Sequence, residues 1–410
     1  MGIGKKIRGL GGVVISLGVL SLLNDIASEM ILPLLPAFIA GLPGGGAVII
    51  GIMEGIAESV SAFLKLASGW LMDKKGGGRF MIAIGYTGAV FSRPLMGLAS
   101  NAFHILGLRI FDRISKGIRT SPRDALIASS CGEQTRGLAF GFHRAMDHTG
   151  ALIGPLISIL LLSSVFHFSV RNVIFLAIVP GILSLIPLSV ALFLTGKKTQ
   201  SALQAEKKVC DRPLMEEEKK KVNLGKNFYL FITVCFIFTL GNSSDLFLLL
   251  RASECGVDKK LLPAIWVVLH ISKMLFSIPG GAFSDKVGRK IPILTGWFIY
   301  FVTYIIFPYT KGEINFFLLF AFYGLYYAFT EGVERAFVGD LVPSNRRGTA
   351  FGLYNFAIAC GALPSSLIMG FLYGYVGPKI AFAICASFSI IAAGGLFFVK
   401  TPLREGGKGT

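Results

Sequence analysis

The stretches Gly69-Trp-Leu-Met-Asp73-Lys-Lys-Gly76 and Gly281-Ala-Phe-Ser-Asp285-Lys-Val-Gly288 share one pattern, and each lies between two long apolar segments. A second phrase is also repeated: Arg136-Gly-Leu-Ala-Phe-Gly returns as Arg347-Gly-Thr-Ala-Phe-Gly. The two phrases occur in the same order and at nearly the same separation in both halves. Halves that repeat in this way predict two similar helical bundles, with a ligand site where the bundles meet.

The composition of the chain places it in a membrane. Hydrophobic residues make up 53% of its 410 residues and charged residues 15%, whereas soluble domains carry about 25% charged residues. Apolar stretches of about 20 residues, enough to cross a bilayer as a helix, recur along the whole sequence. The alternating pattern of a barrel strand is absent, so these stretches predict helices. The predicted spans are 13–40, 47–72, 79–99, 101–127, 136–163, 170–195, 227–251, 260–283, 290–309, 313–341, 347–375 and 378–399.

One polar segment separates the spans into two groups of six. We therefore expect an N-terminal six-helix bundle over residues 1–195, a linker over 196–226 and a C-terminal bundle over 227–410. The linker carries alternating blocks of basic and acidic residues, which is typical of a solvated connection. Its composition predicts a cytoplasmic position.

The net charge of +17 follows the predicted topology. Lys and Arg gather in the loops that share one side of twelve spans, and the opposite loops contain few of them. By the positive-inside rule, both termini face the cytoplasm of a multi-pass plasma (inner) membrane protein. The basic loops are expected to contact anionic lipid, and this distribution argues against nucleic-acid binding.

The repeated loops resemble a known family. Gly281-x-x-x-Asp285-x-x-Gly288-Arg289-Lys290 resembles the loop motif of the major facilitator superfamily. The first copy departs from the motif because Gly77 and Gly78 precede Arg79, which is expected to displace the basic end of that loop. Arg113-Ile-Ser-Lys116-Gly117 is similar to the fourth-helix motif of the superfamily, with Lys116 where a Gln is common. The resemblance implies an all-α membrane protein whose two six-helix bundles are related by pseudo-two-fold symmetry.

The fifth predicted span carries a further family motif. The phrase Gly150-Ala-Leu-Ile-Gly154-Pro155 resembles the fifth-helix motif associated with antiporters. Small residues let two helices approach closely, and Pro155 is expected to bend its span.

The two loop copies are expected to control the contact between the bundles. An Asp at a helix end can accept hydrogen bonds from the first turn of a neighbouring helix, and nearby basic residues can pair with carboxylates across the seam. Such a latch would hold the bundles in one orientation and release them in the other; a tight turn with ordinary basic residues is the alternative. The predicted latch residues are Gly69, Asp73, Gly76, Arg79, Gly281, Asp285, Gly288, Arg289 and Lys290.

Ionisable residues inside the predicted spans are functional candidates, because each costs several kcal/mol in a bilayer unless it is paired or hydrated. Span 101–127 carries a stripe of mostly basic residues that cannot face lipid, and other spans supply carboxylates. The acids either neutralise the bases and hold helices together, or one of them exchanges a proton as the cavity rearranges. The candidates are Asp25, Glu29, Glu54, Glu58, Arg109, Asp112, Arg113, Lys116, Arg144, Asp147, Asp245, Glu331, Glu334 and Arg335, with His143 and His148 as possible relays.

Other chemistry receives less support from the sequence. His270 and Met274 have the spacing that places an imidazole and a thioether on one helix face, which suits copper, but the span 227–251 contains no Met. No phosphate-binding loop and no catalytic arrangement is recognisable, so we expect neither an enzyme nor a bound cofactor.

The sequence therefore predicts a monomeric secondary transporter that moves a small solute by alternating access. Proton coupling is expected from the intramembrane carboxylates, and export or antiport from the fifth-helix motif. A passive facilitator, a transporter-like receptor and a copper transporter using His270 and Met274 remain alternatives. The basic stripe favours an organic anion over a cation, but the sequence does not specify the substrate.

Overall fold

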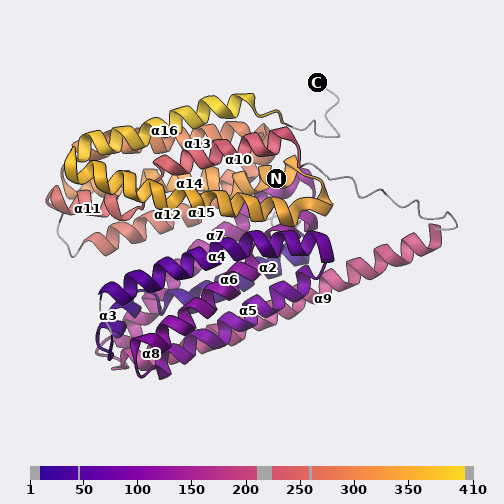
Figure 1. Cartoon of the computed structure of the whole chain (residues 1–410), viewed down its shortest axis with the longest axis horizontal. Coiled ribbons are helices and arrows are strands. Elements are labelled where there is room, and N and C mark those ends of the chain that lie inside the picture. Colours follow the sequence, from indigo (N-terminus) through magenta and orange to yellow (C-terminus); the bar gives the residue numbers. More distant parts are fainter. Residues whose placement is uncertain (1–9, 45–46, 210–223, 258–260, 402–410) are drawn as a thin grey trace.

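The structure is a computed structural model that describes residues 10–44, 47–209, 224–257 and 261–401 (Figure 1). These residues form helices joined by short turns, and no strand occurs among them. Each of the predicted spans coincides with one helix or with two consecutive helices.

The first half contains six predicted spans, two of which are broken. The first span is divided into two helices, and so is the sixth; the third ends in a 3-10 turn at Met96–Leu98. The helices are α2 (Gly12–Glu29), α3 (Leu35–Ala40), α4 (Ala47–Lys75), α5 (Gly78–Leu95), α6 (Ala102–Ser130), α7 (Arg136–Leu162), α8 (Val170–Leu176) and α9 (Ile178–Val209).

The second half repeats this order. Its first span is again divided, here by the polar sequence between Gly241 and Leu246. The helices are α10 (Lys226–Gly241), α11 (Leu246–Glu254), α12 (Leu262–Val287), α13 (Lys290–Ile306), α14 (Glu313–Leu341), α15 (Arg347–Tyr375) and α16 (Pro378–Phe398).

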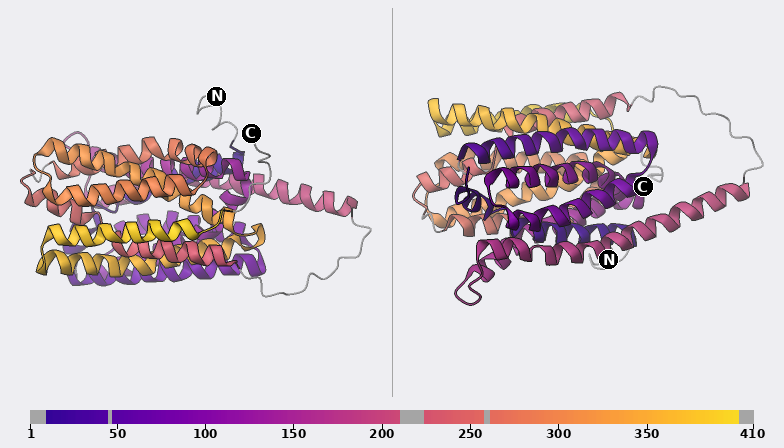
Figure 2. Two further views of the ribbon diagram at one scale, coloured as in Figure 1. Left: turned by 90° about the horizontal axis from the view of Figure 1, so that it is seen from above. Right: turned by 60° about the horizontal axis from the view of Figure 1, so that its bottom comes forward.

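The two halves lie side by side. Helices α2–α9 form one group and α10–α16 the other, and both groups run along the long axis of the molecule (Figures 1 and 2). Across the seam, α7 packs against α12 and α4 packs against α15. These two contacts are equivalent under the sequence repeat, as expected for bundles related by pseudo-two-fold symmetry.

The loops that carry the repeated motifs lie together at one end of the molecule, which we call the linker end. It comprises the turns at 76–77, 131–135, 288–289 and 342–346, and α9 projects beyond the other helices there (Figure 1). The turn at 76–77 needs two glycines with positive φ angles, Gly76 at 71° and Gly77 at 78°, whereas its counterpart needs only Gly288 at 90°. The first-half loop is therefore shaped differently.

Helix α9 does not end where its apolar sequence ends. It continues past residue 195 to Val209, so the predicted linker begins as a helix. Residues 210–223 lie outside the described part of the chain. The division at 1–195, 196–226 and 227–410 stays a prediction.

The helices have the character of membrane spans. Within the described residues, eight helices are long and apolar enough to cross a membrane, and Lys226–Gly241 is apolar but shorter. Helix α6 is not among the eight because of its charged residues, but Arg109, Asp112, Arg119, Arg123 and Asp124 are all buried inside the protein. Their burial reconciles this polar helix with a membrane interior.

Candidate functional site at the seam

The two repeated Asp residues join the halves through backbone hydrogen bonds. The carboxylate of Asp285, at the end of α12, accepts hydrogen bonds from the amides of Gly137 at 2.9 Å and Leu138 at 2.8 Å. Asp73, at the end of α4, accepts equivalent bonds from Gly348 at 3.0 Å and Thr349 at 2.6 Å. Each carboxylate therefore caps the positive N-terminus of a helix of the other half, α7 or α15.

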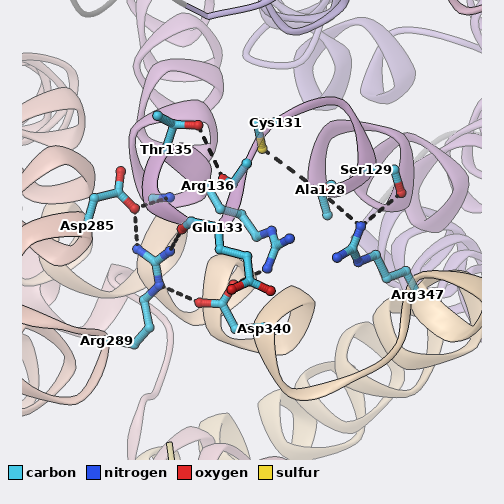
Figure 3. Close-up of polar contacts among 12 residues, drawn as sticks. Ala128, Ser129, Cys131, Glu133, Thr135, Arg136, Asp285, Arg289, Asp340 and Arg347 are labelled. Carbon is cyan, nitrogen blue, oxygen red and sulfur yellow. Dashed lines mark hydrogen bonds and ion pairs between the residues drawn. The ribbon is translucent and has the colours of Figure 1, made fainter. Parts of the chain in front are cut away.

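In the second-half copy, Arg289 extends this contact into a network (Figure 3). Its guanidinium donates to Asp285 at 2.6 Å, to Asp340 at 2.7 Å and to the carbonyl of Glu133 at 2.8 Å. Asp340 also pairs with Arg136 of the first half. Both arginine side chains are only 2% exposed, so these charge-assisted bonds are shielded from solvent and strong.

The first-half copy lacks this network. Ser129 stands at the position that corresponds to Asp340, and Arg347 donates there to the carbonyl of Ala128 at 3.1 Å and to the Ser129 hydroxyl at 3.2 Å (Figure 3). Arg79 is exposed, and Lys290 of the second copy donates outward, to the carbonyl of Phe397 at 3.2 Å. The sequence did not identify Asp340 as a latch residue, although it ends α14 just before the repeated Arg347 phrase.

Glycines let the backbones of the halves touch. Gly69 contacts Gly348, and Gly281 contacts Gly137. A Cβ atom on Gly348 would lie 2.5 Å from the Gly69 carbonyl oxygen and 2.6 Å from the Asp73 carboxylate. Both distances are too short for any side chain, so the closed seam at the linker end requires glycine at these positions.

We expect Asp285→Asn to weaken closure of the linker end more than Asp73→Asn does. The first change also removes a charged partner of Arg289, whereas Asp73 caps α15 without such a network. Hydrogen exchange of the purified protein measures this directly: amides at the start of α7 should exchange faster in Asp285→Asn, and those at the start of α15 in Asp73→Asn. The dissociation constant of the ligand should change by a smaller factor than the rates of amide hydrogen exchange. Unchanged exchange together with lost binding would contradict a latch role.

Part of the charged stripe on α6 is bound within the first half. Arg93 of α5 donates to Asp112 at 2.9 Å and to the carbonyl of Asn24 at 2.8 Å, and Arg109 lies 3.7 Å from the same Asp112. Arg119 donates to the carbonyl of Gly85 at 2.8 Å. These groups join α2, α5 and α6, and the sequence analysis did not select Arg93 or Arg119.

Two further side-chain contacts connect the first half to α14. Asp124 of α6 pairs with Arg335 of α14 and, at 2.9 Å, with its neighbour Arg123. His148 of α7 lies 3.1 Å from Glu331 of α14. Asp124 has no side-chain exposure. The sequence analysis identified Arg335 and Glu331 but not Asp124, the acidic partner of Arg335.

The acids of α2 lie beside the fifth-helix motif. Gly150 packs against Asp25, and Gly154 packs against Glu29, so the small residues of α7 bring it close to α2; Pro155 lies inside α7. Asp25 accepts a hydrogen bond from the Asn24 amide at 3.0 Å, and Glu29 is partly buried.

Asp147 lies one turn before the fifth-helix motif, and several hydrogen-bond donors surround its carboxylate. It accepts from Arg144 at 2.9 Å and from the Ser21 hydroxyl, and the His143 ring lies 3.5 Å away. Its position joins α7 to α2.

The remaining first-half candidates belong to α4 and α6. Arg113 pairs with Glu58 at 3.2 Å, and the Glu58 side chain is 57% exposed. Lys116 is partly buried on α6. The side chain of Glu54 lies outside the described part of the structure.

In the second half, the acids are surrounded by aromatic side chains. Asp245 accepts from the hydroxyls of Tyr323 at 2.8 Å and Tyr327 at 2.7 Å, and Lys273 lies 3.7 Å away. Glu334 is held by Trp297 and Tyr354. The second half thus combines carboxylates with aromatic walls, unlike the basic first half.

The structure places no complete set of metal ligands around His270 and Met274 among the described residues. The ring of His270 lies 6.0 Å from that of His148 and 5.4 Å from that of Trp266, and Met274 is partly buried one turn further along α12. Within the residues that the structure describes, no group of three His, Cys, Asp or Glu side chains is placed to hold a metal ion.

Comparisons with known proteins agree with this architecture. The family model of the Major Facilitator Superfamily matches residues 17–272 and 264–410. An uncharacterized MFS-type transporter of Methanocaldococcus jannaschii is 36% identical over 96% of both chains. The multidrug resistance protein MdtG of Escherichia coli is 27% identical over 67% of this chain and 66% of its own.

Among solved structures, the human organic anion transporter MFSD10 superimposes with a TM-score of 0.73 at 14% sequence identity, covering 94% of this chain and 99% of its own. This likeness concerns the fold alone. One assignment follows from the repeated order of helices, the match to the family model and the M. jannaschii relative. The chain belongs to the major facilitator superfamily, a family of multi-pass membrane transporters and not of enzymes.

Proposed function

We propose that this protein is a secondary active transporter that works by alternating access, and that the structure represents the state closed at the linker end. The observation that carries the proposal is the distribution of contacts between the halves. The polar contacts across the seam, among the described residues, lie in the linker-end portions of α4, α6, α7, α12, α14 and α15 or, for His148 and Glu331, closer to the middle of α7 and α14. Opening this end would break them together.

Coupling to protons is the second part of the proposal. The pairs Asp124–Arg335 and His148–Glu331 join the halves, so opening of the linker end would part Glu331 from His148, whereas Asp124 would keep Arg123. A carboxylate that loses a hydrogen-bond donor or a cation binds a proton more readily, which would link the movement to proton uptake. Asp25, Asp147 and Glu58 lie on the helices that border this region and are further candidates.

We further propose a monomer in the plasma (inner) membrane with the linker end in the cytoplasm. Support comes from the basic residues at that end, among them Lys74, Lys75, Lys286 and Arg346, which would also attract anionic lipid. The fifth-helix motif, packed closely against α2, supports export or antiport. The similar proteins are named for different substrates: MdtG for multidrug resistance and MFSD10 for organic anions.

We expect a pH gradient to drive uptake of ligand into proteoliposomes, and neutralisation of the essential acid to abolish this drive. A thermal-shift screen of the purified protein first identifies a ligand, because binding raises the stability of the folded state. Uptake is then measured with and without a gradient for Asp25→Asn, Glu54→Gln, Glu58→Gln and Asp147→Asn. The variant that no longer responds to the pH gradient should still exchange ligand across the membrane when the ligand concentrations on the two sides are equal.

The matched control is Glu254→Gln. Glu254 lies on α11, away from the seam, and its carboxylate is 3.3 Å from the guanidinium of Arg251. This variant should leave gradient-driven uptake unchanged. Wild-type uptake that ignores the gradient, with normal uptake in all four variants, would instead identify a passive facilitator.

A further inference from the structure

A small cavity lies in the second half, between α10, α14 and α15. Its volume is about 150 Å³, similar to an engineered cavity that accommodates benzene. Its walls are formed largely by the rings of Phe238, Tyr326, Tyr327 and Tyr354, and Glu334 contributes a carboxylate. The cavity therefore suits a compact group that favours both aromatic faces and a negative charge.

Glu334 is held by neutral hydrogen-bond donors. Its carboxylate accepts hydrogen bonds from the Trp297 indole at 3.3 Å and from the Tyr354 hydroxyl at 2.7 Å. Both donors are neutral, and the residue is only 7% exposed. Within the described residues, no basic side chain forms an ion pair with it.

The charged neighbours of Glu334 are already engaged. Arg335 binds Asp124 of the first half, and Glu331 is paired with His148. Two of the three charged groups that line the cavity thus have a partner across the seam, and Glu334 is the third. Among the lining residues alone, two acids face one arginine, so their charges sum to minus one when both acids are ionised.

A buried carboxylate without a cation is costly, and aromatic faces attract cations. The indole and phenol donors hold the Glu334 carboxylate in place, so a bound cation would supply the missing charge without rearrangement. We propose that this cavity binds the cationic group of the substrate, and that the substrate class is an organic amine or quaternary ammonium compound. This assignment rests on the proposed transport function and names its substrate class.

The opposite wall of the seam does not favour an anion as strongly as the sequence suggested. Arg93 and Arg119 are held within the first half, and Arg123 and Arg335 share Asp124. Arg113 is paired with Glu58. Each of these arginines already has a hydrogen-bonding partner, although the arginines outnumber the acids Asp112, Asp124 and Glu58, whereas the carboxylate of Glu334 has neutral partners only.

The protein contains its own reporter for this cavity. Trp297 donates to Glu334 and stacks on Phe238 with 4.9 Å between ring centroids. The chain has three Trp residues, so Trp70→Phe and Trp266→Phe together leave Trp297 as the single fluorophore. A cation that binds beside Glu334 should change its emission.

The test is an equilibrium titration of the full-length protein in detergent with choline and with 3,3-dimethylbutan-1-ol. The alcohol has the same shape but carries carbon in place of the charged nitrogen. We expect choline to change Trp297 emission saturably and to bind at least tenfold more tightly than the alcohol. Glu334→Gln keeps a hydrogen-bonding side chain of the same size, and it should abolish this preference while the alcohol binds as before.

Glu254→Gln is the matched control and should retain the preference for choline. A Glu334→Gln protein that unfolds would be recognised by its melting curve, and Glu334→Asp, which keeps the charge, should then retain preference for choline. Equal affinities for the two probes in the wild type, or a preference that survives Glu334→Gln, would overturn the assignment.

The outcomes separate this site from the proposed function. Gradient-driven uptake of some other ligand, combined with no preference for choline, would leave the transporter proposal standing and refute the cation site. A charge preference that depends on Glu334, combined with no movement of choline across proteoliposomes, would support the site and count against transport.

Discussion

Arg93→Met is expected to lower the free energy of unfolding by about 3–5 kcal/mol, the range for breaking a buried ion pair by removal of one partner. Asp112 would remain in a site where its side chain is 4% exposed, with Arg109 as a more distant partner at 3.7 Å. The bond from Arg93 to the carbonyl of Asn24 would be lost as well. Denaturant titration of the protein in mixed micelles measures the change.

The double variant Arg93→Met/Asp112→Leu tests whether this pair is structural. Removing both charges avoids the uncompensated acid but also takes the acid at 3.7 Å away from Arg109, so part of the lost stability should return. If the pair serves only to join α5, α6 and α2, the double variant should also bind ligand like the wild type. A double variant as unstable as the single one, or a stable one that no longer binds, would contradict the structural role.

The spans were predictable from sequence because hydropathy is a local property. Each predicted span coincides with helix. The breaks in three of them were missed because each break is short and leaves the hydropathy of the span unchanged: one is polar, between Gly241 and Leu246, and the other two, at 30–34 and at Ala177, are apolar. The end of α9 was misplaced for the opposite reason, since a helix can continue after its apolar sequence ends.

The partners within the site were less predictable. The repeated motifs identified Asp73 and Asp285 because both copies could be compared. In contrast, Asp340 has Ser129 in the corresponding position, so the repeat gave no signal for it. Arg93 and Asp124 were missed because an ion pair between helices depends on how their faces are rotated, and the sequence of one helix does not contain that information.

This difference between the copies suggests that the two sides of the linker end separate unequally. The α7–α12 side carries the network of Arg289, Asp340 and Arg136, whereas the α4–α15 side relies on Asp73 and on hydrogen bonds from Arg347. Parting α7 from α12 breaks the ion pair between Arg136 and Asp340, whereas parting α4 from α15 breaks only hydrogen bonds between charged groups and neutral partners. The asymmetry could not be inferred from the loop motif alone.

Gly281→Ala is expected to prevent closure of the linker end and to slow transport more than tenfold. In the closed state the added Cβ would overlap the backbone carbonyl of Gly137, which no rotamer change can relieve, so α7 and α12 must move apart. Without ligand, the equilibrium between closed and open states would shift toward the open state. A destabilisation of the closed state by about 5.5 kcal/mol is enough to change a closed-to-open ratio from 99:1 to 1:99. Hydrogen exchange at the start of α7 should rise accordingly.

Gly394→Ala is the matched control, because nothing lies within 4 Å of a Cβ atom built at that glycine of α16. Alanine favours a helix over glycine by up to about 1 kcal/mol, so this change should leave transport unaltered and stability unchanged or slightly higher. The same substitution thus has a large expected effect on transport at Gly281 and none at Gly394, and the contact across the seam accounts for the difference. Normal transport and slow exchange in Gly281→Ala would show that the close approach of α7 and α12 is not needed for the transport cycle.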